Sequence, residues 1–159
     1  MNTPLRGLIF DLDGTLVQSL PGIAAALNHA LQQNSHPTYS EKEVESFIGD
    51  GIETLVKRAL LPNQQHLLPK ILPDFQEHYS AHWQEGTHPY PGILELLEKL
   101  HTAGIPMAVL SNKPHPYTVD IVKALFPSHL FQTVRGHEAQ FPKKPVSYTH
   151  LTLPTTPYV

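Results

Sequence analysis

The chain has 159 residues, a formal net charge of −3 and 40% hydrophobic residues, which is enough for one sizeable core or for a core with an insertion. The small negative charge and scattered basic residues argue against a nucleic-acid partner, and no apolar run approaches the ~18 residues of a membrane span. Cysteine is absent, and the N-terminal residues lack a signal-peptide pattern, so we expect a cytoplasmic protein without disulfides.

The first predicted element is a short buried strand over residues 6–10, and two carboxylates follow it directly. Asp11 and Asp13 stand two residues apart, and residues at that spacing share one face of a strand. Gly14 allows the backbone to turn, and Thr15 offers a hydroxyl and an N–H group. Mg²⁺ takes one or two protein carboxylates and completes its shell with water and phosphate oxygens. The segment therefore predicts a magnesium and phosphate site with Asp11 and Asp13 as the metal ligands.

A block of helices is predicted next, because apolar residues recur at helical spacing. The expected helices cover residues 19–33, 40–47, 52–60 and 64–84. Ser40 and Glu43 have the spacing of a capping box, and Asp50 is a candidate N-cap of the third helix. Pro69 and Pro73 are expected to break the last helix.

Histidine is frequent, with eleven residues in the chain. His78 and His82 could share a helix face and hold zinc, but the sequence places no third ligand beside them. A surface or core role is therefore the favoured interpretation of the histidines.

The pattern then changes to alternating strands and helices, which is typical of an α/β domain with a parallel sheet. The expected elements are a helix from about 92 to 104, a strand over 106–110, a helix over 113–126 and a strand over 131–134. We predict an α/β fold with a Rossmann-like parallel sheet core formed by residues 1–17 and 88–145. An α-helical cap, residues 18–87, is inserted into it.

The hexapeptide from Asp11 to Leu16 resembles the first motif, D-x-D-G-T, of the haloacid dehalogenase-like phosphatases. The resemblance implies that Asp11 is the nucleophile, which becomes an aspartyl phosphate, and that Asp13 is the general acid and base. It further implies a phosphomonoester substrate and Mg²⁺ as cofactor.

Two later segments look like the second and third motifs of this family. The second is Leu110-Ser111-Asn112-Lys113, where the resemblance implies that the Ser111 hydroxyl holds the phosphoryl group. Without the family context, a serine here is typical of a helix N-cap before Pro114, and the two roles can hold at once. The third is Lys143-Lys144-Pro145, which implies that Lys144, with Lys143 as the alternative, neutralises the phosphate. Thr15 and Asn112 complete the predicted phosphate-binding set.

The acidic loop that forms the family's fourth motif is missing, since no Asp or Glu follows Glu138. Residues 146–155 look like the translation of a transposase-end adapter, so we interpret residues 146–159 as a non-native tail. On this interpretation the core is truncated, and the chain itself is weakly active or inactive.

The helical block resembles the cap of phosphoglycolate phosphatases, which implies 2-phosphoglycolate as substrate. Gly49, Asp50 and Gly51 are the candidate substrate loop, and Arg58 or Lys57 is a candidate partner for a substrate carboxylate. Arg58 could equally lie on a solvated helix face. A sugar-phosphate phosphatase or β-phosphoglucomutase-like enzyme, and a non-catalytic fragment that binds phosphate or magnesium, remain alternatives.

Overall fold

The computed structural model describes residues 6–144, so the predicted tail over residues 146–159 lies outside the described residues. The chain divides into two compact units. The first unit comprises Met1–Leu16 with Pro89–Val159, and the second comprises Val17–His88. Among the helices within residues 6–144, none combines the length and the apolar character that a membrane span requires.

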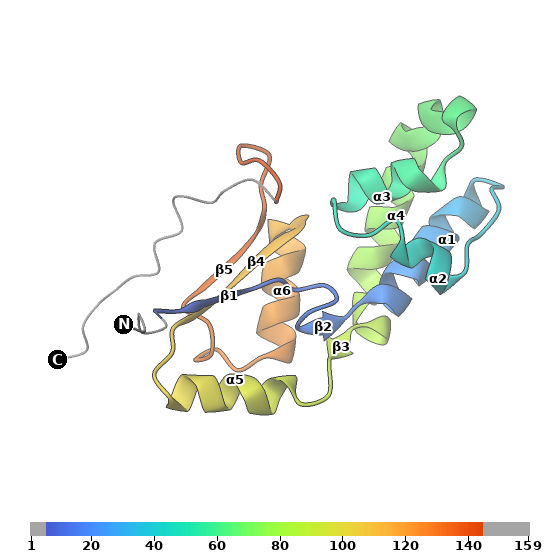
Figure 1. Cartoon of the computed structure of the whole chain (residues 1–159). Coiled ribbons are helices and arrows are strands. Elements are labelled where there is room, and N and C mark those ends of the chain that lie inside the picture. The colour runs from blue at the N-terminus through green and yellow to red at the C-terminus, as the bar shows by residue number, and fades with distance from the viewer. Residues whose placement is uncertain (1–5, 145–159) are drawn as a thin grey trace. The chain divides into compact units, whose positions relative to one another are not determined.

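The first unit is built on a three-stranded parallel sheet in the order β1-β4-β5 (Figure 1). Its strands are β1 (Leu8–Phe10), β4 (Met107–Pro114) and β5 (Thr133–His137), and its helices are α5 (Ile93–Thr102) and α6 (His115–Leu125). Leu8 pairs with Met107, and Ala108 pairs with Thr133, which fixes the register across the sheet. The predicted α/β class with a parallel sheet is confirmed.

Strand β4 lies at the centre of this sheet and is longer than the sequence indicates. Its first four residues, Met107 to Leu110, are buried, as expected for a strand with neighbours on both sides. The strand runs on to Pro114, which pairs with His137 of β5 after an irregularity in the register. The predictions of a strand end at 110 and a helix start at 113 are therefore wrong, and Lys113 belongs to the strand. The last strand also begins two residues later than predicted.

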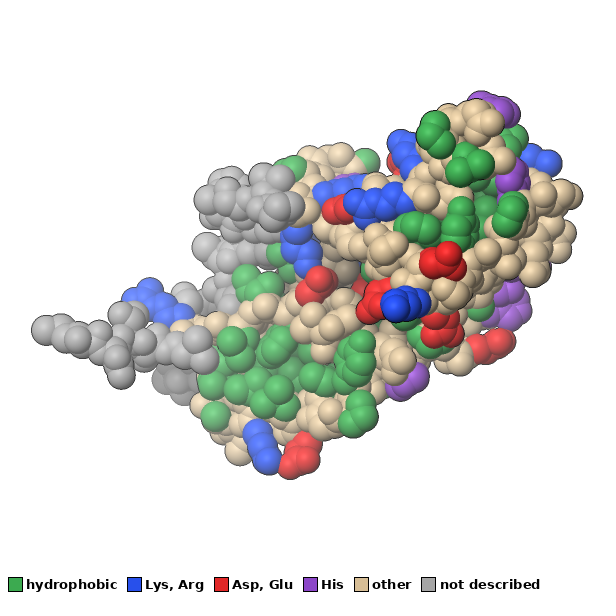
Figure 2. Space-filling view, turned by 45° about the vertical axis from the view of Figure 1, so that its right-hand side comes forward, with side chains coloured by type: hydrophobic (Ala, Val, Ile, Leu, Met, Phe, Trp, Pro, Cys, Tyr) green, Lys and Arg blue, Asp and Glu red, His purple; other side chains and the backbone are tan. Residues whose placement is uncertain are grey.

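Helix α5 leaves much of its apolar surface uncovered. Leu97 is buried, but Leu94 and Leu96 are 42% and 45% exposed. Figure 2 shows hydrophobic side chains gathered in the lower part of the view, at the height where α5 lies in Figure 1. Gly92 and Gly104, at φ 81° and 72°, flank the helix, because a left-handed backbone at its ends suits glycine.

The second unit is mainly helical, and the assignment of residues 18–87 as a cap stays a prediction. Its elements are β2 (Val17–Gln18), α1 (Leu20–Gln33), α2 (Glu41–Glu45), α3 (Ile52–Ala59), η1 (Pro62–Leu67), α4 (Leu68–His82), η2 (Trp83–Gly86) and β3 (His88–Pro89). Helices α1 and α4 pack side by side over buried apolar residues. Leu27 and Leu31 of α1 and Ile71 and Phe75 of α4 are fully buried there. This contact is the core of the unit.

Two local predictions for the helices fail and one holds. Helix α4 runs through Pro73 without a break. The free energy gained by burying Ile71 and Phe75 outweighs the cost of the backbone hydrogen bond that proline cannot donate. Asp50 is not the N-cap of α3; Gly51 takes that position. The capping box of α2 is confirmed, with Ser40 and Glu43 bonded in both directions. The Ser40 hydroxyl and then its backbone N–H lower the pKa of Glu43.

Candidate active site

The loop after β1 is held in shape by its own backbone. Leu12 is buried and anchors the loop, and its N–H donates to Asp11 Oδ1 at 2.8 Å. The N–H of Leu16 donates to the Leu12 carbonyl at 3.0 Å, which closes a turn around Asp13 and Gly14. Gly14 sits at φ 76°, a conformation that a residue with a Cβ adopts only with strain. The turn therefore places two carboxylates at the carboxyl end of β1, as the sequence predicts.

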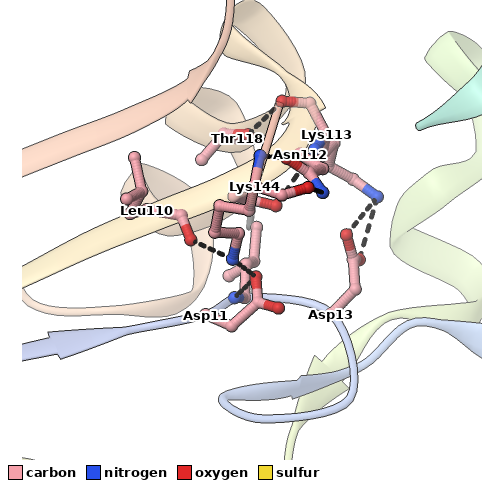
Figure 3. A network of polar contacts seen from close by, with 9 residues as sticks. Asp11, Asp13, Leu110, Asn112, Lys113, Thr118 and Lys144 are labelled. Atoms are coloured by element: carbon pink, nitrogen blue, oxygen red, sulfur yellow. Dashed lines mark hydrogen bonds and ion pairs between the residues drawn. The ribbon is translucent and has the colours of Figure 1, made fainter. Parts of the chain in front are cut away.

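Lys144 reaches Asp11 from the far end of the described chain (Figure 3). Its Nζ lies 2.8 Å from Asp11 Oδ1 and donates to the Leu110 carbonyl at 2.7 Å. The Asp11 side chain remains 46% exposed, whereas that of Lys144 is 24% exposed. Lys144 holds the Asp11 carboxylate on one side, and the exposed side leaves an oxygen free to attack an electrophile, as a nucleophile must.

Asn112 positions Lys144 through its side-chain amide. The Lys144 N–H donates to Asn112 Oδ1 at 2.8 Å, and Asn112 Nδ2 donates to the Lys144 carbonyl at 3.3 Å. Because Asn112 lies in β4, this pair fixes the lysine backbone to the sheet. The structure therefore gives Asn112 a structural partner in Lys144, while its predicted contact with phosphate stays a prediction.

The second carboxylate has a lysine partner that the sequence analysis did not assign to the site. Lys113 Nζ lies 2.9 Å from Asp13 Oδ1 and 3.1 Å from Oδ2, so both oxygens contact one ammonium (Figure 3). The side chains are 4% and 15% exposed. Sequence reasoning placed Lys113 in a helix. The available signal was the two-residue spacing from Ser111, which puts both side chains on one face if the strand continues.

Thr15 lies in the loop that carries Asp11 and Asp13, whereas Ser111 lies in β4, two residues before Lys113. Ser111 is buried in β4, and its Oγ accepts the Lys113 N–H at 3.1 Å. The Thr15 N–H donates to the Leu12 carbonyl at 3.3 Å, and its side chain is exposed. The helix-cap alternative for Ser111 is excluded, because Pro114 occupies the N-cap position of α6. The phosphate roles of both residues stay predictions.

The predicted substrate loop belongs to the second unit. Gly49 and Gly51 have φ values of 122° and 85°, so the backbone itself requires glycine at both positions. Arg58 forms an ion pair with Asp50, and its Nη1 donates to the Phe47 carbonyl at 3.1 Å. These contacts link the loop to α3.

The charges at the first-unit site balance, with Asp11 paired to Lys144 and Asp13 paired to Lys113. Within residues 6–144 no group of three or more His, Asp or Glu side chains could hold a metal ion. Mg²⁺ is often held by only one or two carboxylates and by phosphate oxygens. Asp11 and Asp13 fit that minimal donor set, in which a bound phosphate and water supply most of the ligands.

The histidines of the second unit do not form a zinc site. His29, His78 and His82 stack face to face, with ring centroids 4.1 Å apart for the first pair and 4.4 Å for the second. Burial, and then the neighbouring His29 and His82, lower the pKa of His78.

Comparison with known proteins supports the family that the sequence motifs indicate. Phosphoglycolate phosphatase of Pectobacterium atrosepticum is 35% identical over 147 residues, covering 90% of this chain and 63% of the relative. The Escherichia coli K12 phosphoglycolate phosphatase is 33% identical, covering 89% of this chain and 64% of its own length. A crystal structure of a predicted phosphoglycolate phosphatase from Haemophilus somnus superposes with a TM-score of 0.80 at 32% identity, covering 89% of this chain and 66% of that one.

The chain thus spans slightly less than two thirds of the length of these curated relatives. The family model for haloacid dehalogenase-like hydrolases matches residues 8–152, which include both carboxylates and both lysines of the site. On this match and these relatives, the chain belongs to the haloacid dehalogenase-like hydrolase family.

Proposed function

We propose that this chain carries the active site of a Mg²⁺-dependent phosphomonoesterase that acts on 2-phosphoglycolate. The observation that carries the proposal is the half-exposed Asp11 carboxylate, fixed by Lys144 at the end of β1 with Asp13 two residues away. The names of the relatives support the substrate, because several of them are phosphoglycolate phosphatases.

In the proposed reaction, a carboxylate oxygen of Asp11 attacks phosphorus and the bond from phosphorus to the substrate oxygen breaks. Asp13 donates a proton to the departing alkoxide, which leaves as glycolate. Asp13 then accepts a proton from the water that attacks the aspartyl phosphate, releasing inorganic phosphate and restoring Asp11. Asp13 recovers in the second step the proton that it gives in the first, so each cycle consumes one substrate molecule and one water.

The remaining groups act on charge and position. Lys144 neutralises negative charge on the phosphoryl oxygens, and Ser111 and Thr15 are the proposed hydrogen-bond donors to them. Asp11 and Asp13 would hold Mg²⁺, which supplies further neutralisation of the phosphoryl group when bound. In the second unit, Arg58 is the proposed partner of the substrate carboxylate, because guanidinium and carboxylate form paired hydrogen bonds.

A second candidate function is phosphate or magnesium binding without turnover. The absence of a group of three or more potential metal ligands among residues 6–144 favours it. Two carboxylates that are both paired with lysines offer Mg²⁺ a weak site, and weak metal binding would leave phosphoryl transfer slow.

The test is phosphate release from 2-phosphoglycolate with and without Mg²⁺, with a panel of sugar phosphates as competing substrates. We expect weak Mg²⁺-dependent release by the parent chain and none by Asp11→Asn. Asp120→Asn is the matched control, because Asp120 is an exposed aspartate on α6. Release by Asp11→Asn at the parent rate would overturn the proposal. Phosphate binding without release would instead favour the second candidate, and faster release from a sugar phosphate would change the substrate.

A further inference from the structure

The Lys113–Asp13 ion pair links two parts of the chain that are 100 residues apart in sequence. Nζ contacts both carboxylate oxygens of Asp13, which restricts the position of the carboxylate. Both side chains are largely withdrawn from water, with exposed fractions of 4% and 15%. A buried pair of this kind is sensitive to the loss of either partner, because the remaining charge is left without compensation.

The backbone of Lys113 is braced on both sides by buried groups. Its N–H donates to Ser111 Oγ at 3.1 Å, and the Thr118 hydroxyl, itself fully buried, donates to its carbonyl at 3.2 Å. Gly136 of β5 passes so close that a Cβ there would lie 2.6 Å from the Lys113 carbonyl oxygen. Strand β4, helix α6 and strand β5 therefore each restrict where the Lys113 peptide can lie.

We propose that Lys113 is the positioning residue for Asp13 in phosphoryl transfer; this inference rests on the proposed function. The lysine acts on the Asp13 carboxylate and has no direct role toward the substrate. Because Asp13 exchanges protons in both halves of the reaction, its orientation affects turnover more than substrate binding. A misplacement of a reacting group by about 1 Å can reduce the rate of such a step ~10²-fold.

The experiment measures kcat and KM for 2-phosphoglycolate in Lys113→Met, Lys113→Arg and Lys123→Met. Lys123→Met is the matched control, because Lys123 is an exposed lysine on α6. We expect kcat of Lys113→Met to fall about 10²-fold with KM within twofold of the parent, and Lys113→Arg to recover part of the loss. Lys123→Met should match the parent.

Each other outcome overturns either the positioning role of Lys113 or the proposed function. An unchanged kcat in Lys113→Met overturns the positioning role, and a raised KM with unchanged kcat makes Lys113 a substrate-binding residue instead. A parent chain without phosphate release overturns the proposed function, and the inference with it.

A second measurement keeps the contact testable if Lys113→Met folds poorly. Urea unfolding is measured for Lys113→Met, Asp13→Asn and the double variant. Because the double variant removes both charges, we expect its urea midpoint to lie above that of Lys113→Met. Midpoint shifts that simply add would show that the two side chains do not interact, and would overturn the inference.

Discussion

Replacing Gly136 with alanine would place a methyl group where other atoms already lie. The new Cβ would be 2.4 Å from Thr118 Oγ1 and 2.6 Å from both His115 Cα and the Lys113 carbonyl oxygen. Ordinary contacts begin at 3.4 Å, so these approaches are too short by about 0.8–1.0 Å. Thr118 could rotate, but the other two atoms belong to the backbone, so β5 and the start of α6 must separate.

Overpacking of a well-packed site costs ~1–3 kcal/mol, and we expect ~2–3 kcal/mol here, because the obstructing atoms are mainly backbone. For a chain of this size that corresponds to a thermal midpoint lower by about 4–12 °C. Urea and thermal unfolding monitored by circular dichroism measure the effect. Arg135→Ala, at the neighbouring exposed position of β5, is the control and should stay within ~0.5 kcal/mol of the parent. A loss below ~0.5 kcal/mol in Gly136→Ala would refute the close packing between β5 and α6.

Three further predictions concern the second unit. Gly86→Ala should destabilise this unit by ~2–3 kcal/mol in urea unfolding, because its Cβ would lie 2.4 Å from the Gly22 backbone nitrogen. Gly22→Ala, whose closest contacts are 3.3 Å, should cost far less, and equal losses of unfolding free energy in the two variants would contradict the packing. Ser40→Ala should cost ~1 kcal/mol through loss of the N-cap, and an unchanged urea midpoint would count against the capping box. The pKa of His78 is below its ordinary value of 6.5, so the unfolded chain binds more protons than the folded one below about pH 6.5, and stability falls as the pH drops. His78→Phe should reduce that fall, and a pH dependence of stability identical to that of the parent would argue against a neutral His78 in the stack.

The site elements that sequence predicts well are those with short-range causes. The turn after β1 depends on Gly14 and on hydrogen bonds within six residues, and these follow from the local pattern. The capping box at Ser40 and Glu43 is likewise a local signal. Lys144 was preferred over Lys143 by motif register, and the structure pairs Lys144 with Asp11, while its role in phosphate binding stays a prediction.

The features that sequence reasoning missed depend on distant partners. The sequence pattern predicts a helix from residue 113, whereas pairing of β4 with β5 keeps Lys113 in the strand, where its ammonium contacts Asp13. Pro73 was expected to end a helix, but packing of α4 against α1 carries the helix past it. The residues next to Lys113 and Pro73 do not predict either feature, because both depend on segments that meet only in the folded chain.

The most direct test of the central claim is detection of phosphate on Asp11. Acetyl phosphate is the donor, because acetate leaves without a proton from Asp13, and Asp13→Asn is the variant, because loss of the general base slows hydrolysis of the intermediate. After an acid quench, peptide mass spectrometry should find one added phosphoryl group on Asp11 in Asp13→Asn and none in the Asp11→Asn/Asp13→Asn double variant. Phosphate release by the parent together with no phosphoryl group on Asp11 in Asp13→Asn would contradict the account, as would an equal adduct in the double variant.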